Sequence, residues 1–164
     1  MKRLILATAL TLLFSLTAQS SSANELLIWD KLKGTTPKGY VLLMRHSYAP
    51  GVGDPDNFKL NDCSTQRNLS DVGRQDAQDV GEWLQRREIK IFRVETSRWC
   101  RAKETAQLLG LGKVRLNKNL DSLFEEADAL NHPQTAAVRK QIQNHRNRAG
   151  LLVLVGHYVN IAAL

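Results

Sequence analysis

The stretch that first indicates the fold is YVLLMRH, at residues 40–46. Its first five residues are apolar without interruption, and such a short run is typical of a strand that is buried on both faces. A second run of this kind, LLVLVGH, lies at residues 151–157 and also ends in a histidine. Residues 89–96 alternate in polarity and predict a further strand, and residues 114–116 predict a short one. These runs predict the strands of one sheet.

Helical patterns separate these strands along the chain. Residues 70–87 begin with a serine suited to an N-cap, and residues 102–109 precede Gly110, a residue type that commonly ends a helix. Another helix is expected to begin at Pro133, and a short one at residues 25–33. Strands that alternate with helices favour a mainly parallel sheet with helices on both faces. We therefore expect an α/β fold in three layers, α/β/α.

The length and composition are those of a single globular domain. The chain has 164 residues, of which 43% are hydrophobic and 24% are charged, a balance that excludes a disordered or fibrous protein. Two cysteines are too few for a disulfide-dense scaffold, and no spacing of Cys and His resembles a structural zinc site.

The first 23 residues are predicted to be a secretory signal peptide. Two basic residues precede an apolar run at residues 4–16, and small side chains at residues 21–23 suit cleavage after Ala23. The alternative is an uncleaved membrane anchor, but the run of about 13 residues is shorter than the ~20 that a spanning helix requires. We therefore expect the domain at residues 24–164, in the periplasm or secreted, with no stable membrane insertion after cleavage.

The mature chain would be basic. Cleavage would remove two of the 23 basic residues and leave 21 of them against 16 acidic residues, a net charge of +5. A basic protein can bind nucleic acid, an anionic membrane surface or small anions. Export argues against nucleic acid, and the basic residues form no single stripe, so we expect no nucleic-acid partner.

Residues with reactive or anion-binding side chains follow three of the predicted strands. Arg45 and His46 follow the first, residues 97–101 (SRWCR) follow the second, and His157 follows the last. Ligands of parallel sheets bind beyond the carboxyl ends of the strands, so these side chains should meet at one edge. Guanidinium groups bind phosphate oxygens in pairs, and a neutral imidazole can attack phosphorus. The pattern indicates a site that handles phosphate.

Four segments resemble the signatures of one known family, the histidine phosphatase superfamily. MRHS at residues 44–47 resembles its Arg-His-Gly signature, and SRWCRAKETA at residues 97–106 resembles its Ser-x-x-x-Arg-Ala-x-x-Thr-Ala segment. LSDVGRQDA at residues 69–77 and LVGH at residues 154–157 resemble two further segments, in the same order. The resemblance covers nearly the whole mature chain. It implies a phosphoglycerate mutase-like fold that hydrolyses phosphomonoesters through a phosphohistidine, with no metal and no cofactor.

The chain departs from the family pattern in two places. Ser47 stands where the signature has glycine, which alters the loop without removing the histidine. The sequence also ends at Leu164, seven residues after His157, whereas family members continue with a helix and at least one strand. We therefore expect a domain that is short at its C-terminus, either as a short variant or as a truncated chain.

The resemblance assigns roles to individual residues. It implies that His46 is the nucleophile, that Arg45 and Arg101 clamp the phosphoryl group, and that His157 completes the pocket. His132 and His145 match no family segment and are expected to face solvent.

The general acid that protonates the leaving oxygen is harder to assign. Family members supply it after the third strand, where this chain has LDSLFEE at residues 120–126. Glu125, directly after an apolar anchor, is the preferred candidate, and Asp121 and Glu126 are the alternatives.

Two cysteines lie in the loops nearest the expected pocket. Cys63 belongs to the long polar loop at residues 49–68, and Cys100 lies inside the arginine segment. Export favours a disulfide between them, and two separate thiols are the alternative. We expect the loop at residues 49–68 to select the substrate, with contacts drawn from the charged residues Asp54, Asp56, Lys59 and Arg67.

The leading functional hypothesis is an exported phosphatase. Export suggests an envelope sugar phosphate, for example a lipopolysaccharide-core heptose phosphate, as the small phosphorylated substrate. The alternatives are a phosphohistidine-protein phosphatase and a non-catalytic module that binds phosphate. The sequence alone does not identify the substrate or the oligomeric state.

Overall fold

The structure is a computed structural model that describes residues 28–33 and 37–164. The predicted signal peptide at residues 1–23 lies outside the described residues. Of the helix expected at residues 25–33, the described part, residues 28–33, is helical. Within the described ranges, no helix combines the length and the apolar character needed to cross a membrane.

A parallel sheet forms the centre of the molecule. In the described part of the chain it has four strands in the order β1-β4-β2-β3, and each adjacent pair is parallel. The strands are β1 (Val41–Arg45), β2 (Ile91–Thr96), β3 (Val114–Leu116) and β4 (Leu151–Gly156). Each overlaps one of the predicted strands and differs from it at either end by two residues or fewer.

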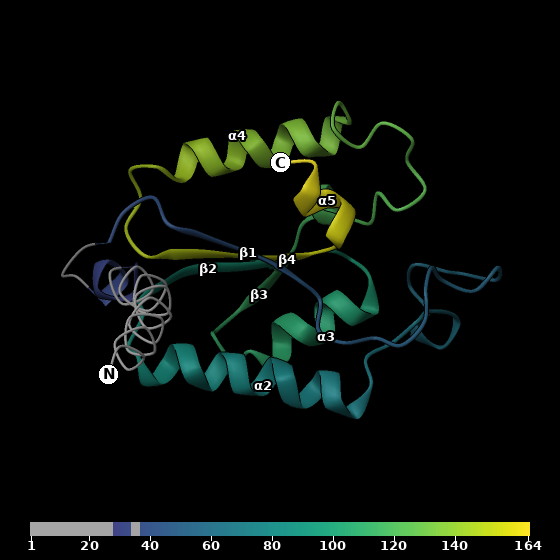
Figure 1. Ribbon diagram of the computed structural model, residues 1–164, viewed down its shortest axis with the longest axis horizontal. Coiled ribbons are helices and arrows are strands. Elements are labelled where there is room, and N and C mark those ends of the chain that lie inside the picture. Colours follow the sequence, from purple (N-terminus) through teal and green to yellow (C-terminus); the bar gives the residue numbers. More distant parts are fainter. Residues whose placement is uncertain (1–27, 34–36) are drawn as a thin grey trace, which may run out of the picture.

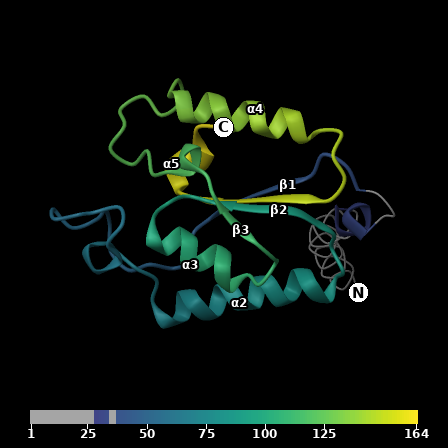
Figure 2. The ribbon, with the colours of Figure 1, turned by 180° about the vertical axis from the view of Figure 1, so that it is seen from behind.

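Helices cover both faces of this sheet, as Figures 1 and 2 show. Helices α2 (Asp71–Arg86) and α3 (Cys100–Leu108) lie on one face, and α4 (Pro133–His145) and α5 (Tyr158–Ala162) lie on the other. Two short 3-10 helices, η1 (Cys63–Thr65) and η2 (Lys118–Leu120), interrupt the loops. The predicted three-layer α/β/α fold is confirmed.

The position of β4 inside the sheet explains why its sequence is apolar throughout. Leu151, Val153 and Val155 pack in the core cluster that includes residues of α2 and α3. Leu152 and Leu154 pack in a second cluster with Val138 of α4. Because both faces of β4 are covered by helices, all six of its residues are buried, and an uninterrupted apolar run is the expected sequence.

The loop at residues 49–68 leaves and rejoins the core at nearly the same point. The backbone N–H of Ser70 donates to the Tyr48 carbonyl (3.1 Å). Gly73, in the first turn of α2, packs so closely against this backbone that a Cβ atom there would collide with the Tyr48 carbonyl. The loop itself extends from the end of the molecule at which β1 and β4 finish (Figure 1).

The prediction that His145 faces solvent is wrong. Its side chain is buried at the end of α4, where Nε2 lies 2.9 Å from the Gly150 carbonyl and the ring packs beside Phe92. It thereby connects the end of α4 to the turn that precedes β4. His132 is half-buried, and its Nδ1 accepts a hydrogen bond from the backbone N–H of Gln134 as the N-cap of α4.

Candidate active site

The carboxyl ends of β1, β2 and β4 bring the predicted site residues to one edge of the sheet. The backbone N–H of His46 donates to the Gly156 carbonyl (2.9 Å), and that of Ser97 donates to the Val155 carbonyl (3.0 Å). These bonds continue the ladder of the sheet past the ends of the strands. The rings of His46 and His157, 111 positions apart in sequence, consequently lie with their centroids 5.4 Å apart.

A cavity of about 730 Å³ opens at this edge. Its walls come from the strand ends, the loop at residues 49–68, the segment after η2 and the start of α5. All five predicted catalytic residues line the cavity. Two are arginines, two are histidines and one is a glutamate: Arg45, Arg101, His46, His157 and Glu125. The structure therefore brings all five to one cavity.

His46 is held in a defined tautomer. Its side chain is buried, and Nδ1 lies 2.8 Å from the carbonyl oxygen of Ser47. Because a carbonyl oxygen can only accept a hydrogen bond, Nδ1 carries the proton and Nε2 keeps its lone pair. Burial lowers the pKa of His46 to about 4, with further lowering by the charges of Arg101 and Arg45. The ring is therefore neutral at neutral pH.

His157 is more deeply desolvated than His46. Burial, followed by the positive charge of Arg101, lowers its pKa to about 2. Its Nε2 lies 2.9 Å from Ser97 Oγ, and the edge of its ring meets Trp99, with the centroids 5.6 Å apart. Ser97 and Trp99, which the sequence analysis left without roles, therefore orient this ring. The only signal for them was their place inside the segment that resembles the family signature.

The two arginines of the site differ in exposure. Arg45, the last residue of β1, is exposed at the cavity wall. Arg101 lies in the first turn of α3, and its side chain is only 3% exposed. Its Nη1 donates to Asp54 Oδ1 (2.6 Å) and its Nη2 donates to Asp54 Oδ2 (3.1 Å). Asp54, considered above as a substrate contact, thus forms a two-pronged ion pair with Arg101.

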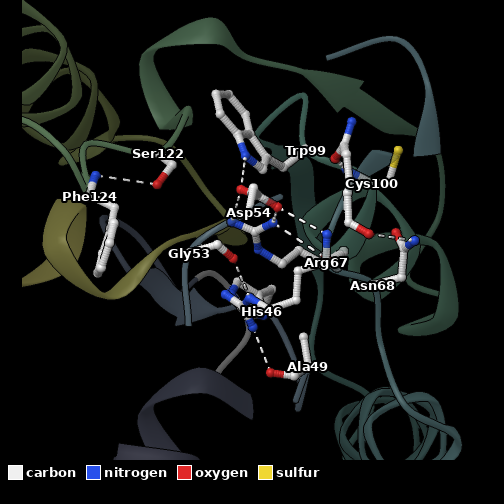
Figure 3. Close-up of polar contacts among 12 residues, drawn as sticks. His46, Ala49, Gly53, Asp54, Arg67, Asn68, Trp99, Cys100, Ser122 and Phe124 are labelled. Atoms are coloured by element: carbon white, nitrogen blue, oxygen red, sulfur yellow. Dashed lines mark hydrogen bonds and ion pairs between the residues drawn. The ribbon is translucent and has the colours of Figure 1, made fainter. Parts of the chain in front are cut away.

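The loop at residues 49–68 is fixed to the site by several polar contacts (Figure 3). Asp54 also accepts hydrogen bonds from Trp99 Nε1 (2.9 Å) and from the backbone N–H of Arg67 (3.0 Å). The guanidinium group of Arg67 donates to the carbonyls of Gly53 (2.7 Å) and Ala49 (2.5 Å). Burial raises the pKa of Asp54, but the hydrogen bonds from Arg101, Arg67 and Trp99 outweigh it and hold the pKa below its usual range.

A disulfide joins this loop to the start of α3. It links Cys63 with Cys100, so the alternative of two separate thiols is wrong. Beside it, the backbone N–H of Cys100 donates to Gln66 Oε1 (2.9 Å). Gln66 Nε2 in turn donates to the carbonyls of Lys59 (3.0 Å) and Leu60 (2.9 Å). The loop is therefore attached to the helix that carries Arg101.

The three candidates for the general acid lie in different surroundings. Glu125 and Glu126 are exposed and line the cavity. Asp121 is buried and is not part of the lining, and its Oδ2 lies 2.6 Å from Arg98 Nη2. This ion pair makes Asp121 a structural residue and leaves the two glutamates as candidates.

The residue directly before Glu125 is not the apolar anchor that the sequence analysis expected there. Phe124 is 56% exposed at the cavity wall. Leu123 is the anchor, because its side chain is 2% exposed and its backbone N–H donates to Asn160 Oδ1 (3.2 Å).

No metal site accompanies this cavity in the part of the chain that the structure describes. Within residues 28–33 and 37–164, no three His, Cys, Asp or Glu side chains are grouped so that they could hold a metal ion. Besides its carboxylates, the cavity is lined by Arg45, Arg67 and Arg101 and by two neutral imidazoles, groups that suit an anionic ligand.

The family profile described as "Histidine phosphatase superfamily (branch 1)" matches residues 41–151, more than half of the chain. The chain therefore belongs to the histidine phosphatase superfamily. Within that class it is a phosphatase, and the resemblance to this family is confirmed. Three of the four sequence segments, at residues 44–47, 69–77 and 97–106, lie within the matched range.

Solved structures show the same fold. The protein histidine phosphatase SixA in complex with tungstate aligns with a TM-score of 0.51 at 19% identity, over 74% of this chain and 70% of that one. A phosphoserine phosphatase from Entamoeba histolytica, in complex with 3-phosphoglyceric acid, aligns with a TM-score of 0.54 at 16% identity, over 75% and 76% of the two chains. A protein from Mycobacterium tuberculosis aligns with a TM-score of 0.55 at 19% identity, over 75% and 76%. No curated protein sequence matches the chain.

Proposed function

We propose that this chain is an exported phosphatase that hydrolyses a small phosphomonoester through a phosphohistidine on His46. The observation that supports this proposal most directly is the hydrogen bond from His46 Nδ1 to the Ser47 carbonyl. It leaves Nε2 of a neutral imidazole as the nucleophile in a cavity that also contains Arg45 and Arg101.

The first half of the reaction transfers the phosphoryl group to the enzyme. Nε2 of His46 attacks phosphorus while the bond between phosphorus and the ester oxygen breaks. The departing oxygen takes a proton from the carboxyl group of Glu125. Arg45, Arg101 and His157 stabilise the charge on the three phosphoryl oxygens that do not leave.

The second half restores the enzyme. A water molecule attacks the phosphorus of the phosphohistidine, and the bond between phosphorus and Nε2 breaks. The Glu125 carboxylate takes a proton from the water, and inorganic phosphate leaves. Nδ1 keeps its proton throughout, because the Ser47 carbonyl holds it.

Trapping the intermediate tests this mechanism. The enzyme is quenched after brief mixing with a radiolabelled phosphomonoester, and the protein is examined for label that is stable to base and labile to acid. We expect label on the wild type, less label on His157→Ala and none on His46→Ala. His132→Asn, which keeps an acceptor at the N-cap of α4, is the matched control and should label as the wild type does.

Two labelling results would contradict the proposal that His46 is the nucleophile. Label that persists on His46→Ala would show another nucleophile. Absence of label and turnover in every form, with inorganic phosphate still bound, would support the non-catalytic phosphate-binding module instead.

Export is part of the proposal and rests on the sequence of residues 1–23. A periplasmic location favours an envelope sugar phosphate, such as a lipopolysaccharide-core heptose phosphate, over cytoplasmic metabolites. N-terminal sequencing of the protein recovered from the bacterial periplasm should begin at Asn24. Recovery of a membrane-bound form that begins at Met1 would instead identify an uncleaved anchor.

A phosphohistidine-protein phosphatase is the second candidate. Its support is the similarity in fold to SixA, described as a protein histidine phosphatase. A phosphohistidine substrate leaves as an imidazole, so this activity depends less on an acid in the cavity. Turnover of a phosphohistidine protein but not of sugar phosphates would favour this candidate.

A further inference from the structure

The guanidinium group of Arg101 has two edges that can each bind a pair of oxygens. One edge, formed by Nη1 and Nη2, is bound to the two oxygens of Asp54 at 2.6 and 3.1 Å. The other edge is formed by Nε and the remaining N–H of Nη2. In the part of the chain that the structure describes, Nε is buried and has no hydrogen-bond partner.

An unpaired buried N–H is uncommon because burial removes its hydrogen bond to water without replacing it. Arg101 lines the cavity beside His46 and His157, so an anion bound there can supply the missing acceptor. Two oxygens of a phosphoryl group would pair with Nε and Nη2, the same two-pronged geometry that Asp54 makes with the adjacent edge.

Asp54 is itself held in place by groups other than Arg101. Trp99 Nε1 donates to its Oδ2 (2.9 Å), the backbone N–H of Arg67 donates to its Oδ1 (3.0 Å), and its side chain is only 16% exposed. Figure 3 shows the carboxylate between Trp99 and Arg67. The carboxylate is therefore held independently of Arg101 and offers a fixed partner to its guanidinium group, whose Nη1 also donates to the Arg67 carbonyl (3.4 Å).

We propose that Asp54 is a positioning residue that holds one edge of Arg101 so that the Nε edge binds the phosphoryl group. This inference rests on the proposed function, in which Arg101 binds phosphate. The long, jointed side chain of arginine would otherwise sample several orientations, and fixing it in advance lowers the entropy lost on binding.

The opposite view is that Asp54 competes with the substrate by occupying Arg101 as an internal anion. The two views predict opposite signs for one measurement. Removing the negative charge of Asp54 would strengthen anion binding if the carboxylate competes, and Coulomb attraction alone gives the same sign. If Asp54 positions Arg101, removing it weakens anion binding despite the more positive cavity.

The experiment measures the dissociation constant of inorganic phosphate by calorimetry on the full mature chain. We expect Asp54→Asn to raise it about tenfold or more, the loss typical of a disrupted charged hydrogen bond. Asp76→Asn makes the same chemical change at an exposed residue of α2 outside the cavity. This control should stay within about twofold of the wild type.

A double-mutant cycle separates positioning from a general structural effect. Arg101→Lys keeps the charge but lacks the second edge, so it should weaken phosphate binding by itself. In this background Asp54→Asn should weaken binding no further, because the two residues act through one contact. Additive losses would instead mean that Asp54 acts on the cavity by another route, and would overturn the proposal.

The remaining outcomes also decide the matter. Unchanged or tighter phosphate binding by folded Asp54→Asn overturns the proposal, whereas no weakening by Arg101→Lys overturns the phosphate clamp of the proposed function instead. If Asp54→Asn fails to fold, Trp99→Phe is measured alone and in the Arg101→Lys background. It removes one donor to Asp54 and keeps the charge of the carboxylate, but Trp99 also contacts His157. Weakening that disappears in the Arg101→Lys background supports the proposal, and unchanged binding or weakening that persists there rejects it.

Discussion

At the scale of single residues, the contact between His46 and the Ser47 carbonyl fixes the proton on Nδ1 and leaves the lone pair on Nε2. Ser47 replaces the glycine of the family signature, yet the contact uses its backbone oxygen and does not depend on its side chain. The backbone N–H of Ser47 donates to Thr105 Oγ1 (3.0 Å), which fixes this peptide against α3. The substitution is therefore compatible with a positioned nucleophile.

The low pKa of His46 predicts the acidic limb of the pH–rate profile. Below a pH of about 4 the ring of the free enzyme is protonated and has no lone pair for attack. The second ionisation of the phosphate ester has a pKa of about 6 and is corrected for first. The corrected kcat/KM should stay level as the pH falls to about 5 and then decline with a midpoint of about 4, since kcat/KM reports the ionisable groups of the free enzyme.

The measurement is kcat/KM for one phosphomonoester between neutral pH and the acid limit at which circular dichroism still shows a folded chain. An acidic midpoint near 6.5, the ordinary value for histidine, would contradict the desolvated ring.

The general acid can be assigned by comparing two neighbouring substitutions. Glu125→Gln should lower kcat/KM for an alkyl phosphate by about 100-fold, the usual contribution of a positioned acid. It should change kcat/KM for nitrophenyl phosphate far less, because nitrophenolate leaves without protonation and kcat/KM does not include the later hydrolysis of the phosphohistidine. Glu126→Gln is its matched partner, with the same chemistry one residue along the same exposed cavity wall.

The pattern of the two variants gives the assignment. A selective loss with Glu126→Gln alone would move the role to that residue. If both variants keep their full alkyl phosphatase rate, the segment after η2 does not supply the acid.

At the scale of elements, the disulfide between Cys63 and Cys100 restrains the loop at residues 49–68 beside the cavity. The two cysteines are separated by 37 positions in sequence, and the segment between them includes Gln66 and Arg67 and ends beside Arg101. Replacing both cysteines with serine should lower the free energy of unfolding by about 3–4 kcal/mol, from the greater freedom of the unfolded chain. KM should rise as well, because the loop that carries Asp54 becomes less constrained.

Urea denaturation and steady-state kinetics check this prediction. A reducing agent should shift the free energy of unfolding and the KM of the wild type to the values of the double variant. The double variant is the control, and its own values should not change. Equal stability and equal KM for the two proteins under oxidising conditions would show that the other contacts of the loop suffice.

Hydrophobic periodicity predicted the helices and strands well, but it did not predict contacts between side chains of different elements. β4 is covered on both faces, so its sequence is apolar throughout, and the N-cap serine of α2 accepts from Gly73 N as its position suggests. The burial of His145 was missed, because its partners are a carbonyl and a ring that belong to other elements. A pattern local to one helix carries no information about such partners.

At the scale of the whole molecule, the parallel sheet gathers residues that are far apart in the chain. The prediction that His46, Arg101 and His157 would meet followed from their places after predicted parallel strands and from the family segments, and the structure places them around one cavity. The pairing of Asp54 with Arg101 could not be predicted, because the loop offers several charged residues and no periodicity selects among them. Such pairings depend on tertiary geometry alone.

The short stem of the long loop has a consequence for how this enzyme can diversify. Because Tyr48 and Ser70 are joined by a direct backbone hydrogen bond, the two ends of the intervening segment stay together whatever its length. Doubling its length would cost only about 0.6 kcal/mol of closure entropy, so new substrate preferences are accessible by insertion or grafting. A grafted segment would also have to restore the contacts of this loop with α3, namely the carboxylate on Arg101, the disulfide to Cys100 and the acceptor for the Cys100 backbone N–H.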